Sequence, residues 1–139
     1  MKIALVSCCK SKLDHNAEAQ LIYTGDLFRK TKSYAEQNYD GWLILSALLG
    51  VVHPKEIIEP YEYTLIGKTQ NVKREWAKKV FVELSIHPSD TEFYVFAGAD
   101  YRQYLVPLLE NAGYKVTVPL QGLGIGQQKA WLKKALVDG

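Results

Sequence analysis

The stretch KIALVSCCKSK, residues 2–12, is the strongest guide to the fold of this chain. Its first part, residues 2–6, is short, apolar and β-branched, which is typical of a buried parallel strand. Two thiols, two hydroxyls and two ammonium groups follow within residues 7–12. Because ligands of open α/β sheets collect beyond the carboxyl ends of the strands, we expect a site at this point.

The residues that follow this strand offer two kinds of chemistry. Ser7, Lys10 and Lys12 could hold a phosphate or carboxylate through hydroxyl donors and positive charge. A cysteine beside two ammonium groups could also have a lowered pKa, which makes Cys8 a candidate nucleophile. The simpler alternative is a pair of solvated lysines and a packed cysteine. Of these, the sequence favours a ligand-binding loop.

Length and composition describe an ordinary globular protein. A chain of 139 residues with 47% hydrophobic and 23% charged residues can form one domain with a substantial core. The net charge of +2 is too small to indicate a nucleic-acid binder by itself. The two cysteines are adjacent and cannot close a long loop, and neither a secretory signal nor a membrane span is recognisable. We therefore expect a reduced, cytoplasmic protein without a membrane partner.

Hydrophobic periodicity predicts alternating strands and helices. The expected strands cover residues 2–6, 42–46, 92–97 and 115–119. The expected helices cover residues 26–38, 72–86, 100–111 and 126–137, with Pro107 bending the third helix or delaying its start. Such alternation predicts a single three-layer α/β domain at 1–139, with a mainly parallel four-stranded sheet and helices on both faces. Residues 48–70 fit neither period, and we expect an irregular, functional connection there.

The irregular connection contains further candidate site residues. His53 could act as an acid, a base or an anion ligand, because the unperturbed pKa of histidine lies near neutrality. Glu59 and Tyr61 flank Pro60 and could bind the hydroxyls of a sugar or the edge of a base. An exposed histidine and simple loop packing are the alternatives.

Two later turns could also approach a ligand. Asp100 and Tyr101 open a helix after the third expected strand, where Asp100 could cap the helix and Tyr101 could stack on a ligand. Gly124 and Gly126 lie in a glycine-rich turn before the last helix, which could cradle an anion with backbone N–H groups. No zinc-ligand spacing, nucleophile elbow or phosphate-loop motif occurs, so we expect neither a metal nor a cofactor.

One helix carries a concentration of positive charge. Lys73, Arg74, Lys78 and Lys79 are expected on the outer face of the second predicted helix. This face is the best candidate patch for DNA or RNA, although most such faces are merely solvated.

Several segments together resemble a known group of proteins. They are SCCKSK at 7–12, IYTGDLF at 22–28, LSA at 45–47, GVVHP at 50–54 and IEPY at 58–61. This combination resembles a bacterial and phage family of uncharacterised small α/β domains, which is distantly similar to the YaaA peroxide-stress proteins. The positions that match the YaaA scheme are Ser7, Lys10, Pro54, Pro60 and Tyr61, while Cys8 and Lys12 match the closer family. Cys8-Cys9 replaces the expected Pro-Ala, and the chain is much shorter.

The resemblance implies DNA binding and protection from oxidative damage, or a place beside enzymes that modify nucleic-acid bases. The residues themselves favour a nucleotide- or nucleobase-handling enzyme that hydrolyses or transfers the glycosyl group of a nucleoside. In this hypothesis Lys10 and Lys12 neutralise phosphate, Tyr23 and Tyr61 contact sugar or base, and His53 or Glu59 transfers protons. The partner would be a phosphorylated small molecule or a nucleic-acid component, and the oligomeric state stays open. The alternative is a non-enzymatic DNA-binding stress protein.

Overall fold

The computed structural model describes residues 1–138, and the side chains of 1–137. The main sheet contains β1 (Lys2–Ser7), β3 (Gly41–Ser46), β4 (Gly50–Val52), β6 (Glu92–Phe96) and β7 (Lys115–Thr117), and a small second sheet contains β2 (Ala17–Glu18) and β5 (Ile57–Ile58). The helices are α1 (Ala19–Ile22), α2 (Asp26–Asn38), α3 (Gln70–Leu84), α4 (Ala99–Asn111) and α5 (Ile125–Asp138). The structure is therefore mixed α/β, as the alternating pattern predicts.

The first strand lies at the centre of the main sheet, whose order is β4-β3-β1-β6-β7. It pairs in parallel with β3 on one side and with β6 on the other, and Leu5 stands opposite both Leu43 and Val95. Strand β7 continues the parallel pairing beyond β6. A strand with neighbours on both sides and helices on both faces is buried in its middle, which explains the apolar run at residues 3–6.

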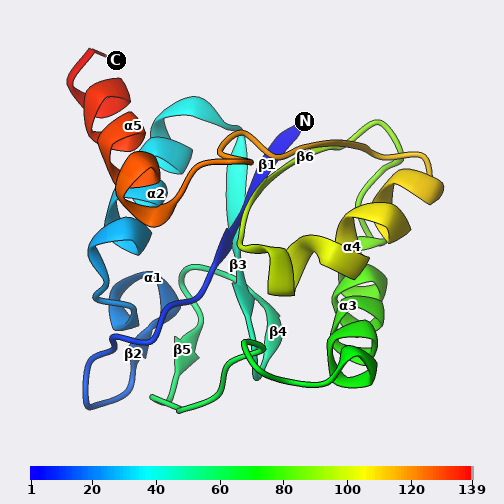
Figure 1. Ribbon diagram of the computed structural model, residues 1–139, viewed down its shortest axis with the longest axis horizontal. Helices are drawn as coiled ribbons and strands as arrows, with labels where there is room; N and C mark the ends of the chain where they lie inside the picture. Colours follow the sequence, from blue (N-terminus) through cyan, green and yellow to red (C-terminus); the bar gives the residue numbers. More distant parts are fainter. Residues whose placement is uncertain (139) are drawn as a thin grey trace.

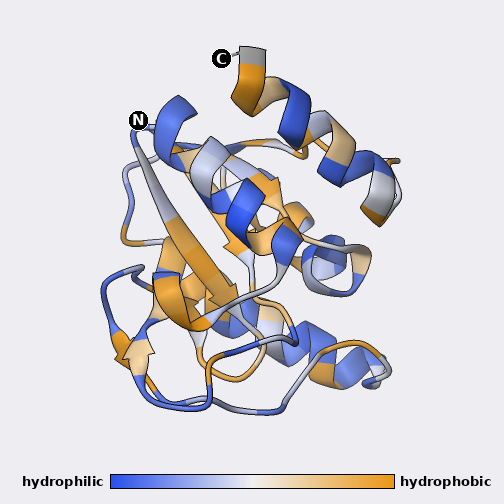
Figure 2. Cartoon of the chain, turned by 90° about the vertical axis from the view of Figure 1, so that its left-hand side faces the viewer, coloured by the Kyte–Doolittle hydropathy of each residue, from blue (hydrophilic) through white to orange (hydrophobic). Residues whose placement is uncertain are grey.

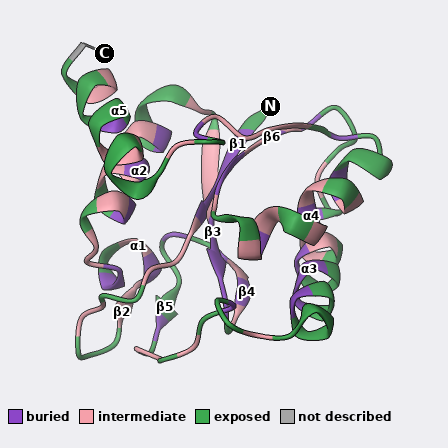
Figure 3. Cartoon of the chain, in the orientation of Figure 1, coloured by how far each residue is buried: buried purple, intermediate pink, exposed green. Residues whose placement is uncertain are grey.

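Alternate residues of β1 enter two hydrophobic clusters. Ile3 and Leu5 pack with residues of α3 and α4, whereas Ala4 and Val6 pack with residues of α1, α2 and α5. Figure 1 shows these two groups of helices on opposite sides of the sheet. The buried residues form stripes on the helices in Figure 3, and Figure 2 shows hydrophobic residues concentrated on the central strands. The period of two along the strand thus divides the core.

The expected count of four strands is wrong, because the sheet has five. The missed strand β4 runs antiparallel to β3, and Ile44 stands opposite Val52. It lies in the segment that we expected to be irregular, which also contains β5. These strands have three and two residues, too few for an alternating pattern to be recognised.

The four predicted helices are present with small shifts of their ends. Helix α2 has the predicted bounds, and α4 begins at Ala99 and continues through Pro107, so the proline does not delay the start of the helix. The short helix α1 was not predicted. Among the described residues, no helix combines the length and the hydropathy needed to cross a membrane.

Candidate functional site

Cys8 lies directly beyond the carboxyl end of β1, where three strand ends come together. Its backbone N–H donates to the Leu45 carbonyl at 2.9 Å, which extends the pairing of β1 with β3. The Ala47 N–H donates to Cys8 Sγ at 3.4 Å, and the Tyr101 hydroxyl oxygen lies 3.8 Å from the same sulfur. Residues that follow β1, β3 and β6 therefore meet at one half-buried thiol.

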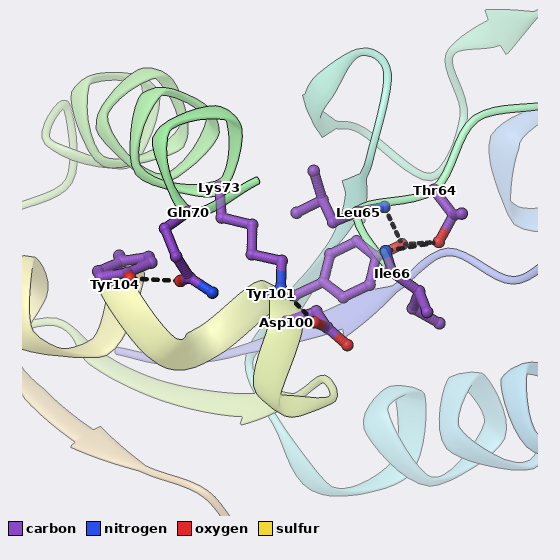
Figure 4. Close-up of polar contacts among 8 residues, drawn as sticks. All are labelled: Thr64, Leu65, Ile66, Gln70, Lys73, Asp100, Tyr101 and Tyr104. Carbon is purple, nitrogen blue, oxygen red and sulfur yellow. Dashed lines mark hydrogen bonds and ion pairs between the residues drawn. The ribbon is translucent and has the colours of Figure 1, made fainter. Parts of the chain in front are cut away.

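Tyr101 connects this thiol to the loop before α3. Its hydroxyl lies 3.3 Å from Thr64 Oγ1 and accepts a hydrogen bond from the Leu65 N–H at 3.5 Å. Figure 4 shows the Tyr101 ring extending from the start of α4 toward these two residues. Burial and the neighbouring Cys8 raise the pKa of Tyr101 to about 12, so the phenol is protonated at neutral pH.

A second group of hydroxyls lies around Tyr61. The Tyr61 hydroxyl is 2.7 Å from Tyr23 Oη and 2.7 Å from Ser46 Oγ, which itself accepts from the Leu49 N–H at 3.0 Å. Burial raises the pKa of Tyr23 to about 12 and also raises the pKa of Tyr61. Tyr23 is only 1% exposed, so it holds the Tyr61 hydroxyl in place from within the core.

An open groove of about 360 Å³ lies on the outer side of Tyr61. The residues that line it are Lys10, Lys12, Leu13, Asp14, Pro60, Tyr61 and Glu62. The Lys12 ammonium lies 4.5 Å from the centre of the Tyr61 ring and 5.6 Å from that of Tyr23. The groove therefore combines two cations, one aromatic ring and two carboxylates, which suits a ligand with both charged and planar parts.

The second thiol has a different environment. Cys9 Sγ lies 3.3 Å from the Ser11 carbonyl oxygen, to which it donates. A side chain at Gly25 would bring its Cβ within 3.0 Å of the same sulfur, so the loop and the start of α2 approach closely here. Burial raises the pKa of the Cys9 thiol, which favours a packing role.

The basic face predicted on α3 needs a correction at Lys73. Its ammonium is buried and pairs with Asp100 Oδ1 at 2.7 Å, as Figure 4 shows. Lys73 shares the inner stripe of α3 with Trp76, Ala77 and Val80, at the spacing of one helical face. Of the other cations, Lys79 donates to the Leu49 carbonyl and Lys78 pairs with Glu75, while Arg74 lies over the Tyr104 ring.

The remaining predicted residues are more widely distributed. His53 and Glu59 are exposed, and the His53 ring accepts a hydrogen bond from the Lys55 N–H. Ser7 ends β1 in a half-buried position. Gly124 and Gly126 are exposed at the start of α5, where Gly124 donates its N–H to the Gln127 side chain. The structure thus brings Cys8, Tyr23, Tyr61 and Tyr101 together, with Lys10 and Lys12 in the adjoining groove.

Sequence reasoning missed three residues of this region. Ser46 and Thr64 supply hydroxyls to the tyrosines, and Lys73 supplies the buried charge. The helical spacing of Lys73 to Trp76 and Val80 was the available signal for its burial. Within residues 1–138, no group of three or more His, Cys, Asp or Glu side chains is arranged to hold a metal ion.

The fold and these contacts define an α/β domain with a cysteine- and tyrosine-rich region at the carboxyl edge of its parallel strands. The chain belongs to a family of unknown function, DUF6884, which matches residues 3–134. No curated protein and no solved structure matches the chain.

Proposed function

We propose that this protein is an enzyme that binds a nucleotide or nucleobase in the groove beside Tyr61 and hydrolyses or transfers its glycosyl group. The observation that carries the proposal is that Lys10, Lys12 and the Tyr61 ring line the same groove. The volume of about 360 Å³ lies within the range of small-molecule sites. The location beyond the end of a central parallel strand is also the usual one for ligands of open α/β sheets.

Each part of such a ligand has a suitable group in the groove. The ammonium groups of Lys10 and Lys12 offer charge-assisted hydrogen bonds to a phosphate. The Tyr61 ring offers a face or edge to a base, and the carboxylates of Asp14 and Glu62 can accept from sugar hydroxyls or amino groups. The two carboxylates would repel a phosphate placed near them, so the phosphate is expected to contact the lysines.

Proton transfer needs a group close to the bound ligand. We keep His53 and Glu59 as the candidates, because Glu59 immediately precedes groove residues Pro60 and Tyr61 and His53 is solvent-accessible. Cys8 is the candidate nucleophile, since it lies in the same hydroxyl-rich region as Tyr61.

The alternative of nucleic-acid binding by α3 has less support. The burial of Lys73 against Asp100 removes one of its four cations from the surface, and Lys78 and Lys79 already have partners. Of the four cations, this leaves only Arg74, and one cation is too little charge for a surface that binds a phosphate backbone.

The proposal is tested by a thermal-shift screen of nucleotides, nucleosides and modified nucleobases at millimolar concentration. A ligand of the native state should raise the midpoint of unfolding. Lys12→Ala should lose most of that shift, because its ammonium contributes about 1.5 to 3 kcal/mol to a charged hydrogen bond. Lys68→Ala is the matched control, since Lys68 lies over the Tyr63 ring at a similar 4.7 Å but does not line the groove.

The control variant should keep the full ligand-induced shift. If no compound of the panel raises the midpoint, or if both lysine variants lose the shift equally, the groove is not the nucleotide site.

A further inference from the structure

A second, smaller cavity lies at the ends of β6 and β7 and has no place in the function proposed above. Its volume is about 60 Å³. The walls come from the end of β6, from α4, from the turn after β7 and from α5. The lining residues that matter for its chemistry are Arg102, Gln121 and Gln128.

Arg102 gives this cavity its charge. The guanidinium carries five N–H donors, and one of its nitrogens donates to the Ala97 carbonyl at 3.0 Å. None of the lining residues is Asp or Glu. Among the described side chains, no carboxylate lies within ion-pair distance of Arg102, and the nearby Asp100 is paired with Lys73 instead. The cavity therefore contains a positive charge without a compensating negative one.

The rest of the wall strengthens the case for an anion. Val95, Phe96, Val118 and Leu120 belong to the lining, but the surface that the cavity exposes is mostly polar, which suits a charged ligand. Gln121 is exposed and adds an amide donor, whereas the Gln128 amide already donates to the Leu123 carbonyl at 2.8 Å. A half-buried guanidinium in such surroundings is stabilised by an anionic partner.

The size of the cavity limits the ligand. A volume of about 60 Å³ exceeds what one water needs, but it is far below the roughly 300 Å³ at which sites begin to hold whole drug-sized molecules. We propose that the Arg102 cavity binds a single oxyanion group, a phosphate or a carboxylate. This site is separate in its lining residues from the groove beside Tyr61 and does not depend on the function proposed for that groove.

The test measures stabilisation of the full chain by inorganic phosphate, by acetate and by a phosphate monoester at constant ionic strength, with chloride as the reference. Phosphate or acetate should raise the unfolding midpoint in a saturable manner. Arg102→Gln should weaken that binding about tenfold or more, because it removes charge-assisted hydrogen bonds. Lys68→Ala removes a positive charge that lines neither the cavity nor the groove, and it should leave the phosphate effect unchanged.

A second pair of variants covers the case in which Arg102→Gln fails to fold. Gln121→Glu places a carboxylate of the same shape at an exposed position of the lining and should abolish anion binding. Gln37→Glu makes the same charge change at an exposed position on α2 and should bind like the wild type.

The arms of the experiment also identify the anion. A larger effect of phosphate or of acetate assigns the site to that group, and a response to the monoester shows that the phosphate of a larger molecule can enter. If neither anion exceeds chloride, or if Gln121→Glu and Gln37→Glu respond alike, the cavity is a solvent pocket and the proposal is overturned.

Discussion

At the residue scale, the two adjacent cysteines have different surroundings. Cys8 Sγ receives a backbone N–H from Ala47 and lies against the Tyr101 hydroxyl. The Tyr101 oxygen accepts from the Leu65 N–H and from the Cys8 thiol, so its own proton is available to Thr64 Oγ1. Cys9 instead donates to the Ser11 carbonyl and packs against Gly25. Adjacent positions in the sequence therefore correspond to different thiol chemistry.

Alkylation kinetics should separate the two thiols. Because burial raises the pKa of Cys9, this residue has less thiolate at neutral pH than an ordinary cysteine. The Cys8→Ser variant, in which Cys9 is the remaining thiol, should therefore react more slowly with iodoacetamide than the Cys9→Ser variant. Rates measured against pH check this order, and a faster reaction of the Cys8→Ser variant would contradict it.

At the element scale, helices α3 and α4 are joined by the Lys73–Asp100 ion pair near the start of α4. Both helices pack into the same cluster through Trp76, Leu105 and Leu109. The ion pair adds a fixed polar contact to this apolar surface and holds the helix turn that carries Tyr101. The position of the Tyr101 hydroxyl beside Cys8 thus depends on how α3 and α4 meet.

Replacing Asp100 should lower the free energy of unfolding more than replacing Lys73 does. Asp100→Asn leaves the Lys73 charge buried without a counterion and should lower the free energy of unfolding by about 2 kcal/mol, less than a fully buried pair would lose because Asp100 is partly exposed. Lys73→Met leaves a carboxylate that water can reach and should cost about 1 kcal/mol or less. Urea unfolding of both variants tests the order. Equal losses would mean that the Lys73 charge is solvated in spite of its position.

The same helix shows what could be inferred before the structure. The amphipathic period predicted both ends of α3 to within two residues. The concentration of positive charge, however, led us to expect Lys73 on the solvent-exposed face of this helix, where it is not. The better guide was the pair of apolar residues Trp76 and Val80, which lie three and seven positions after Lys73 and therefore on the same helical face. Strand β4 could not be recognised in the same way, because three residues carry too little periodicity and its pairing with β3 is a long-range property.

At the scale of the whole molecule, the parallel sheet brings the candidate site together. Segments near residues 8, 46, 61 and 101 are far apart in sequence, and the order β3-β1-β6 brings them to one edge. That meeting was predictable, since parallel strands end on the same side of a sheet. The hydroxyl network was not, because the partners of Tyr61 and Tyr101 depend on side-chain orientation within the long connection before α3.

The buried phenols of this network should make the fold sensitive to alkali. The pKa values of Tyr23 and Tyr101 are raised from 10.0 to about 12 in the folded protein. Between these values the unfolded chain releases protons that the folded chain retains, so the free energy of unfolding should fall as the pH rises. Their contribution to stability is fully present below pH 10 and is lost by about pH 12.

Urea unfolding at a series of alkaline pH values, with phenolate absorbance as a second signal, measures this loss. Tyr23→Phe should be less stable at neutral pH by about 1 kcal/mol, because it loses its hydrogen bond to Tyr61, yet its stability should decline less steeply with pH. Tyr104→Phe keeps both buried phenols and should retain the steep decline. If the Tyr23 and Tyr104 variants decline alike, the Tyr23 phenol does not contribute to the alkaline loss of stability.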